Sequence, residues 1–218
     1  MFNYLRFADL SMIEKELEIV TQSLEVFLKY GIKAVTMDDM SRHLGISKKT
    51  LYKFVKDKND LVGKALKLQC ESENMVLCSI QNKDLNSIEE MFEIGLFITG
   101  LLKQVHPSIH YDLEKYHSDA FTHMIGLHQD NVYKCILQNL KKGIKEGFYR
   151  KDLNEKVIAQ LYIQRIDLLF NAEVFPPEEI SFEEVYAVMF RYHIRGISNK
   201  KGLEYLEKKE KKQRKAKK

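Results

Sequence analysis

The chain has few of the residues that break helices or cross-link a fold. Its 218 residues include only 3 Pro, 10 Gly and no Trp. This scarcity argues against a turn-rich all-β protein and favours long helices. The three cysteines, Cys70, Cys78 and Cys135, fit neither a disulfide framework nor a CxxC metal site. We therefore expect them to be small buried apolar residues in a reduced protein.

Long apolar runs and targeting signals are also absent. No stretch of about 18 apolar residues occurs, so we expect no membrane span and no membrane partner. The N-terminal sequence MFNYLRFADLSM lacks the basic start, apolar run and small-residue cleavage site of a signal peptide. Both absences favour a cytoplasmic protein. Met12 is an alternative start of the chain.

Patterns typical of catalysis and of cofactors are missing as well. There is no Gly-rich phosphate loop, nucleophile elbow or distinctive pair of carboxylates. No acid or Cys completes a tetrahedral zinc site with the histidines that gather in one segment: His106, His110, His117, His123 and His128. We expect neither an enzyme nor a bound metal or cofactor.

The positive charge lies mostly at the C-terminal end. The formal net charge is +4, and residues 201–218 alone contribute +6, which leaves −2 for residues 1–200. Residues 207–218 have too few apolar side chains to pack, and we expect them to be a disordered basic tail. Only a local cluster of cations in the folded part could therefore indicate where a nucleic acid binds.

Apolar residues recur at helical spacing along most of the chain, so the fold class is predicted to be all-α. A first amphipathic helix covers residues 14–30 and ends at Gly31, and a long helix starts at Asp57 and extends towards residue 80. Breaks at Pro and Gly residues define the later helices, near 85–104, 107–117, 119–145, 154–174 and 181–206.

Two short helices between residues 36 and 55 are predicted to form a helix-turn-helix. Thr36 caps the first of them, and Gly45 permits a left-handed exit. Ser47 caps the second, Lys48–Val55, after a connection of only two residues.

The second of these helices is locally basic. Residues 47–58 contain five Lys and one Asp, a local charge of +4. In the major groove, the first residues of such a helix, Lys48, Lys49 and Thr50, would contact base edges while Leu51 faces the core. A solvated charged face is the alternative, but it would not explain both caps and the tight turn.

The segment from Thr36 to Leu61, including Thr50-Leu51-Tyr52, resembles the DNA-binding domain of the TetR family, and the resemblance spans about residues 14–62. Most members have an aromatic pair where this chain has Phe54-Val55, which we interpret as repacking. The resemblance implies phosphate contacts for Tyr52, Lys58 and Thr36. The full set of expected DNA-contacting residues is Thr36, Ser47, Lys48, Lys49, Thr50, Tyr52, Lys53, Phe54 and Lys58.

The same resemblance implies a division into domains. A three-helix DNA-binding domain would cover residues 12–58, and a larger helical effector-binding and dimerisation domain residues 59–206, before the tail at 207–218. Residues 154–174 and 182–197 would pack against their symmetry mates as a four-helix bundle. We expect a homodimer that binds a palindromic double-stranded DNA operator, with repression as the family's common outcome.

A small apolar effector is expected to modulate DNA binding. Phe92, Phe97, Phe121 and Met124 could line an apolar cavity, although ordinary core packing is the alternative. The segment 106–117 resembles part of the effector domain in some TetR-like regulators, which makes Tyr111, Tyr116 and His117 further candidates for ligand contact.

Two other functions fit the same pattern. One is a DNA-binding regulator controlled by a protein partner. The other is a helical hydrophobe-binding carrier with a vestigial helix-turn-helix, and the presence of Lys48, Lys49, Tyr52 and Lys58 argues against it.

Overall fold

A computed structural model describes the backbone of residues 2–171, 173–176 and 178–216, and their side chains except those of 2–11, 123, 167, 210 and 212–216. The described residues form helices, as predicted, and their only β-type pairing is an isolated bridge between Tyr149 and Ser198. None of the helices in the described part is long and apolar enough to cross a membrane.

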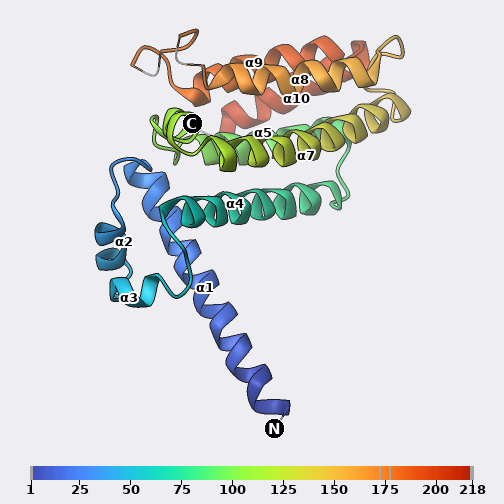
Figure 1. The fold of residues 1–218 in the computed structure, drawn as a ribbon. Helices are drawn as coiled ribbons and strands as arrows, with labels where there is room; N and C mark the ends of the chain where they lie inside the picture. Colours follow the sequence, from blue (N-terminus) through green and yellow to red (C-terminus); the bar gives the residue numbers. More distant parts are fainter. Residues whose placement is uncertain (1, 172, 177, 217–218) are drawn as a thin grey trace. The chain divides into compact units, whose positions relative to one another are not determined.

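Figure 1 shows the succession of helices. They are α1 (Phe2–Tyr30), α2 (Met37–His43), α3 (Lys48–Leu51), α4 (Lys58–Gln81), α5 (Ser87–Leu102), α6 (Ile109–Tyr116), α7 (Ser118–Lys145), α8 (Glu155–Leu169), α9 (Phe182–Ile197) and α10 (Lys200–Ala216). The first helix therefore begins well before residue 14, where the apolar repeat begins.

The chain divides into two compact units whose boundary differs from the predicted one. Unit 1 comprises Met1–Glu73 and Gln104–His128, and unit 2 comprises Asn74–Lys103 and Gln129–Lys218. The first part of α4, all of α6 and the start of α7 thus belong with the N-terminal helices rather than with a separate domain from residue 59. The reason is packing, because α6 and α7 share an apolar core with α1 to α4.

The core of unit 1 fixes the two short helices through one or two side chains each. Met40 of α2 is 1% exposed and Leu51 of α3 is fully buried, as predicted for Leu51. They pack with α1 and α4 side chains and with Leu113 of α6. Full burial of such side chains contributes about 1.5–3 kcal/mol each, which is large for helices as short as these.

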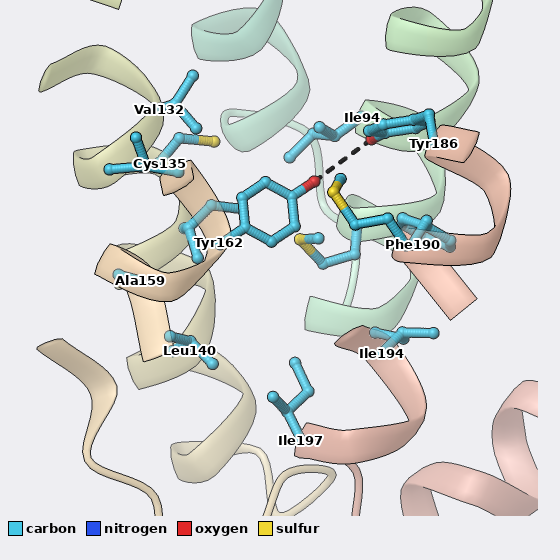
Figure 2. Packing of buried hydrophobic residues seen from close by; sticks show 14 of the residues in the cluster. Ile94, Val132, Cys135, Leu140, Ala159, Tyr162, Tyr186, Phe190, Ile194 and Ile197 are labelled. Atoms are coloured by element: carbon cyan, nitrogen blue, oxygen red, sulfur yellow. Dashed lines mark hydrogen bonds between the residues drawn. The ribbon is translucent and has the colours of Figure 1, made fainter. Parts of the chain in front are cut away.

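Unit 2 is built around α5, the second part of α7, and α8 to α10. Its core includes Tyr162 of α8 and Tyr186 of α9, whose hydroxyl oxygens lie 3.4 Å apart (Figure 2). Burial raises the pKa of Tyr162 to about 12, so its hydroxyl stays protonated and can donate inside the apolar core.

Two helix predictions in unit 2 were wrong. The segment 181–206 is two helices, because α9 ends at Ile197 and α10 begins at Lys200. Asn199 holds the break: its side-chain amide donates to the carbonyls of Gly147 and Tyr149. The tail was also wrongly predicted, since α10 extends to Ala216. Lys, Glu and Ala, which dominate the end of α10, are strong helix formers, and Leu206 anchors the helix in the core of unit 2.

The cysteine prediction holds for two of three residues. Cys70 and Cys135 are buried, but Cys78 is exposed. Cys78 lies on the solvent face of α4, where its thiol contacts the Asn74 side chain at 3.9 Å.

Candidate nucleic-acid interface

The helix-turn-helix of unit 1 is held by the caps predicted from its sequence. The Asp39 N–H donates to Thr36 Oγ1, and the Thr36 N–H donates to the Asp39 carboxylate, each at 3.1 Å. Gly45 has φ +63°, which a residue with a side chain rarely adopts. The Thr50 N–H then donates to Ser47 Oγ at 3.0 Å. These contacts fix the start of α3 relative to the end of α2.

The α3 helix is shorter than predicted. The α-helix ends at Leu51. In the turn that follows, each N–H donates to the carbonyl three residues earlier, from Lys53 to Thr50 and from Phe54 to Leu51. The side chain of Tyr52 is 46% exposed, Lys53 is exposed and Phe54 is half-buried. The surface of this segment therefore carries lysines and a tyrosine, as a phosphate-binding surface requires.

The first residues of α3 differ in how free their side chains are. Lys48 Nζ lies 2.6 Å from the Asp38 carboxylate of α2, whose hydrogen bond raises the pKa of Lys48. The Thr50 hydroxyl is 2.9 Å from the Ser47 hydroxyl. Lys49 is exposed and forms no ion pair within the described part of the chain. Lys49 is thus the cation best placed to contact a base edge.

Lys64 is a positioning residue that the sequence did not reveal. Its Nζ donates to the Phe54 carbonyl at 2.6 Å and lies 2.7 Å from the Glu16 carboxylate of α1. It therefore connects α1, α4 and the turn after α3. A lone Lys on an amphipathic helix gives no local signal of this role.

Lys58, expected to contact phosphate, lies at the start of α4 beside the turn between α1 and α2. Its Nζ is 3.4 Å from the Lys33 carbonyl oxygen. The side chain is half-buried; burial lowers its pKa, and the Asp112 carboxylate opposes that shift. The ammonium group is therefore held near the surface by a backbone acceptor.

Comparison with known proteins agrees with this geometry. A family model described as bacterial regulatory proteins of the tetR family matches residues 19–65. The segment that carries the helix-turn-helix thus matches the TetR family. YvaF of Bacillus subtilis (strain 168), an uncharacterized HTH-type transcriptional regulator, is 23% identical over 156 residues, which cover 71% of this chain and 80% of that protein.

The TetR fold extends beyond the matched segment. A TetR-family regulator from Agrobacterium tumefaciens has a TM-score of 0.69 at 11% identity, covering 86% of this chain and 100% of the other. Another from Cytophaga hutchinsonii has a TM-score of 0.64 at 16% identity, covering 87% and 98%. The chain therefore shares the fold of these regulators over most of its length.

Asp112 of α6 is a second residue that the sequence did not reveal. Its carboxylate accepts hydrogen bonds from the N–H groups of Ile32 and Lys33, at 3.1 and 2.9 Å, and from the Ser108 hydroxyl at 3.2 Å. The turn it binds begins at Gly31, where φ is +79° and an added Cβ would lie 2.7 Å from Ser108 Oγ. This contact joins α6 to the turn between α1 and α2 within unit 1.

The residues predicted to contact an effector are divided between the two units. Phe92 and Phe97 pack against the core of unit 2, whereas Phe121 belongs to the core of unit 1 and Met124 packs against that core. His117 is half-buried, and its Nδ1 has no hydrogen-bond partner among the described residues. Tyr111 and Tyr116 are 54% and 40% exposed on α6.

Two histidines of the histidine-rich segment contact protein groups rather than lying together as metal ligands. His128 Nδ1 lies 3.3 Å from the Glu73 carboxylate, and the His106 N–H donates to the Leu28 carbonyl. Within the described residues, no group of three or more His, Cys, Asp or Glu side chains is arranged to hold a metal ion.

Proposed function

We propose that this protein is a transcriptional regulator that binds a palindromic DNA operator as a homodimer. The observation that carries the proposal is the capped helix-turn-helix, in which Leu51 is fully buried while Lys49 and Tyr52 face solvent. The buried face fixes the orientation of α3, and the exposed face supplies cations and polar groups for the major groove and the flanking phosphates.

An exposed apolar surface on unit 2 supports the homodimer. Its members, all at least 43% exposed, are Val157, Leu161 and Leu168 of α8 and Val188 and Tyr192 of α9. The other face of these helices already fills the core of unit 2, as with Tyr162, Leu169, Val185 and Met189. All five exposed side chains lie within the segments 154–174 and 182–197 expected to form a four-helix bundle, so they are available to a second subunit.

We also propose that a small apolar effector modulates DNA affinity by favouring one of two pre-existing conformations. A change at α6 would reach the DNA-binding helices through Asp112, and a movement of α4 would reach them through Lys58. Repression is the expected outcome, because a dimer bound at an operator that overlaps a promoter excludes the polymerase.

Selection from random duplexes tests the proposal. The protein should enrich a two-fold-symmetric site whose half-sites are separated by whole helical turns, as the symmetry of a dimer requires. Enrichment of no site would contradict the function. Binding to the selected operator is then measured with and without the small molecules of a cell extract. A change in affinity supports a small effector, whereas a change produced only by the protein fraction favours control by a partner protein.

A further inference from the structure

Four exposed side chains of unit 1 form a cluster in which two cations meet two aromatic rings. Lys115 Nζ lies 5.0 Å from the ring centroid of Tyr111 and 5.6 Å from that of Tyr116. Lys33 Nζ, from the turn after α1, lies 4.9 Å from the Tyr116 centroid. We call Lys33, Tyr111, Lys115 and Tyr116 the Lys-Tyr cluster.

The cluster brings together two like charges without an acidic partner. Among the described side chains, neither Lys33 nor Lys115 forms an ion pair with a carboxylate, and Lys115 Nζ instead donates to the Tyr111 hydroxyl at 2.5 Å. The nearby Asp112 carboxylate is buried and accepts hydrogen bonds from backbone N–H groups. A hydrogen bond with Lys33 lowers the pKa of Tyr116, which reflects the local excess of positive charge.

The cluster is continuous with the proposed DNA-binding surface. The carbonyl of Lys33 is the acceptor for Lys58 Nζ. Lys33 also lies in the turn that leads into Thr36, the N-cap of α2. Thr36 and Lys58 are both expected to contact the DNA backbone, so an anion bound by the cluster would lie beside phosphates that the helix-turn-helix already contacts.

We propose that Lys33 and Lys115 bind a phosphodiester group of the operator backbone, so that α6 contributes directly to the DNA interface. The phosphodiester supplies the negative charge that the two ammonium groups lack as a partner, and the tyrosine hydroxyls can donate to its oxygens. A phosphate on DNA fits better than a free anion, because Thr36 and Lys58, which are expected to contact neighbouring phosphates, lie on the same surface. The proposal rests on the proposed function.

The test compares binding of the selected operator over a range of salt concentrations. Each lysine lost from the interface should reduce the slope of log affinity against log salt by about 0.9 unit, for the operator and for an unrelated duplex alike. We therefore expect a shallower slope for the double variant Lys33→Gln, Lys115→Gln. Lys33→Arg, Lys115→Arg keeps both charges and should keep the slope.

A charge-matched control is Lys67→Gln, Lys141→Gln, which removes two exposed lysines outside the cluster. Equal slopes for this control and the cluster variant would overturn the proposal while leaving the proposed function intact. Ethylation interference provides a second measurement: phosphates whose ethylation blocks the native protein but not the cluster variant locate the contact, and their absence would also overturn it. If the native protein bound no duplex, both the cluster contact and the proposed function would fail.

Discussion

His193 is a titratable side chain that the core of unit 2 keeps neutral. It is 5% exposed, its ring centroid lies 4.6 Å from that of Tyr162, and its Nε2 has no hydrogen-bond partner among the described residues. Burial, helped by the charge of Arg165, lowers its pKa to about 4. Because the unfolded chain binds a proton at about pH 6.5, unfolding takes up a proton between these two values.

The free energy of unfolding should therefore fall as the pH drops from about 6.5 to about 4, with no further loss from this group below that range. His193→Phe should remove this pH dependence. Relative to its value at neutral pH, the free energy of unfolding of the variant should then exceed that of the native protein by about 3 kcal/mol at pH 4. Urea unfolding at several pH values measures it, with His43→Phe, at an exposed histidine, as the control. Parallel stability curves for the native protein and His193→Phe would contradict the assignment.

At the scale of elements, the contact between α6 and the turn after α1 depends on one carboxylate. Removing it leaves the buried Ile32 N–H and the part-buried Lys33 N–H without their acceptor. We expect Asp112→Ala to lower the free energy of unfolding by about 3 kcal/mol, since charge-assisted hydrogen bonds are lost and buried donors stay unpaired. Denaturant unfolding of this variant and of Glu114→Ala, an exposed acid on the same helix, gives the comparison. Equal effects would show that the contact contributes nothing specific.

Elements whose ends are encoded locally were predicted well from the sequence. Thr36, Gly45 and Ser47 each act on groups within a few residues, so their spacing alone was sufficient to predict the helix-turn-helix. The break between α9 and α10 was missed because Asn199 is held by carbonyls about 50 positions away in the chain. The same reason hid Asp112, whose partners at Ile32 and Lys33 are 80 and 79 positions distant.

The candidate site follows the same rule. The set of exposed residues around α3 could be predicted, because helical periodicity places Leu51 inwards and its neighbours outwards. The ion pair of Lys48 with Asp38 joins two helices, and only the folded structure shows that, of the two lysines that begin α3, Lys49 is the one without an ion pair to a described residue. The effector site stays a prediction. Its expected residues are divided between the two units, so neither unit alone brings all of them together.

At the scale of the whole molecule, the proposed dimer depends on apolar side chains that α8 and α9 leave exposed. Leu161 is 46% exposed, so Leu161→Lys should leave the subunit folded while placing two charges in the interface of a dimer. We expect dimer dissociation to become at least tenfold more favourable in sedimentation experiments. The matched control is Leu96→Lys, at a 60% exposed leucine of α5. A dimer equally stable in both variants would place the interface elsewhere.

Recognition of bases by α3 is tested most directly by selecting random duplexes with the native protein and with one variant. The native protein should enrich a two-fold-symmetric site, and Lys49→Ala, Thr50→Ala should enrich a site degraded at matching positions in both halves. A bidentate contact to a base is worth about 1–3 kcal/mol of discrimination, whereas a lost phosphate contact weakens all sequences equally. If the variant enriches the same sharp site with uniformly lower affinity, α3 does not recognise the bases and the account is contradicted.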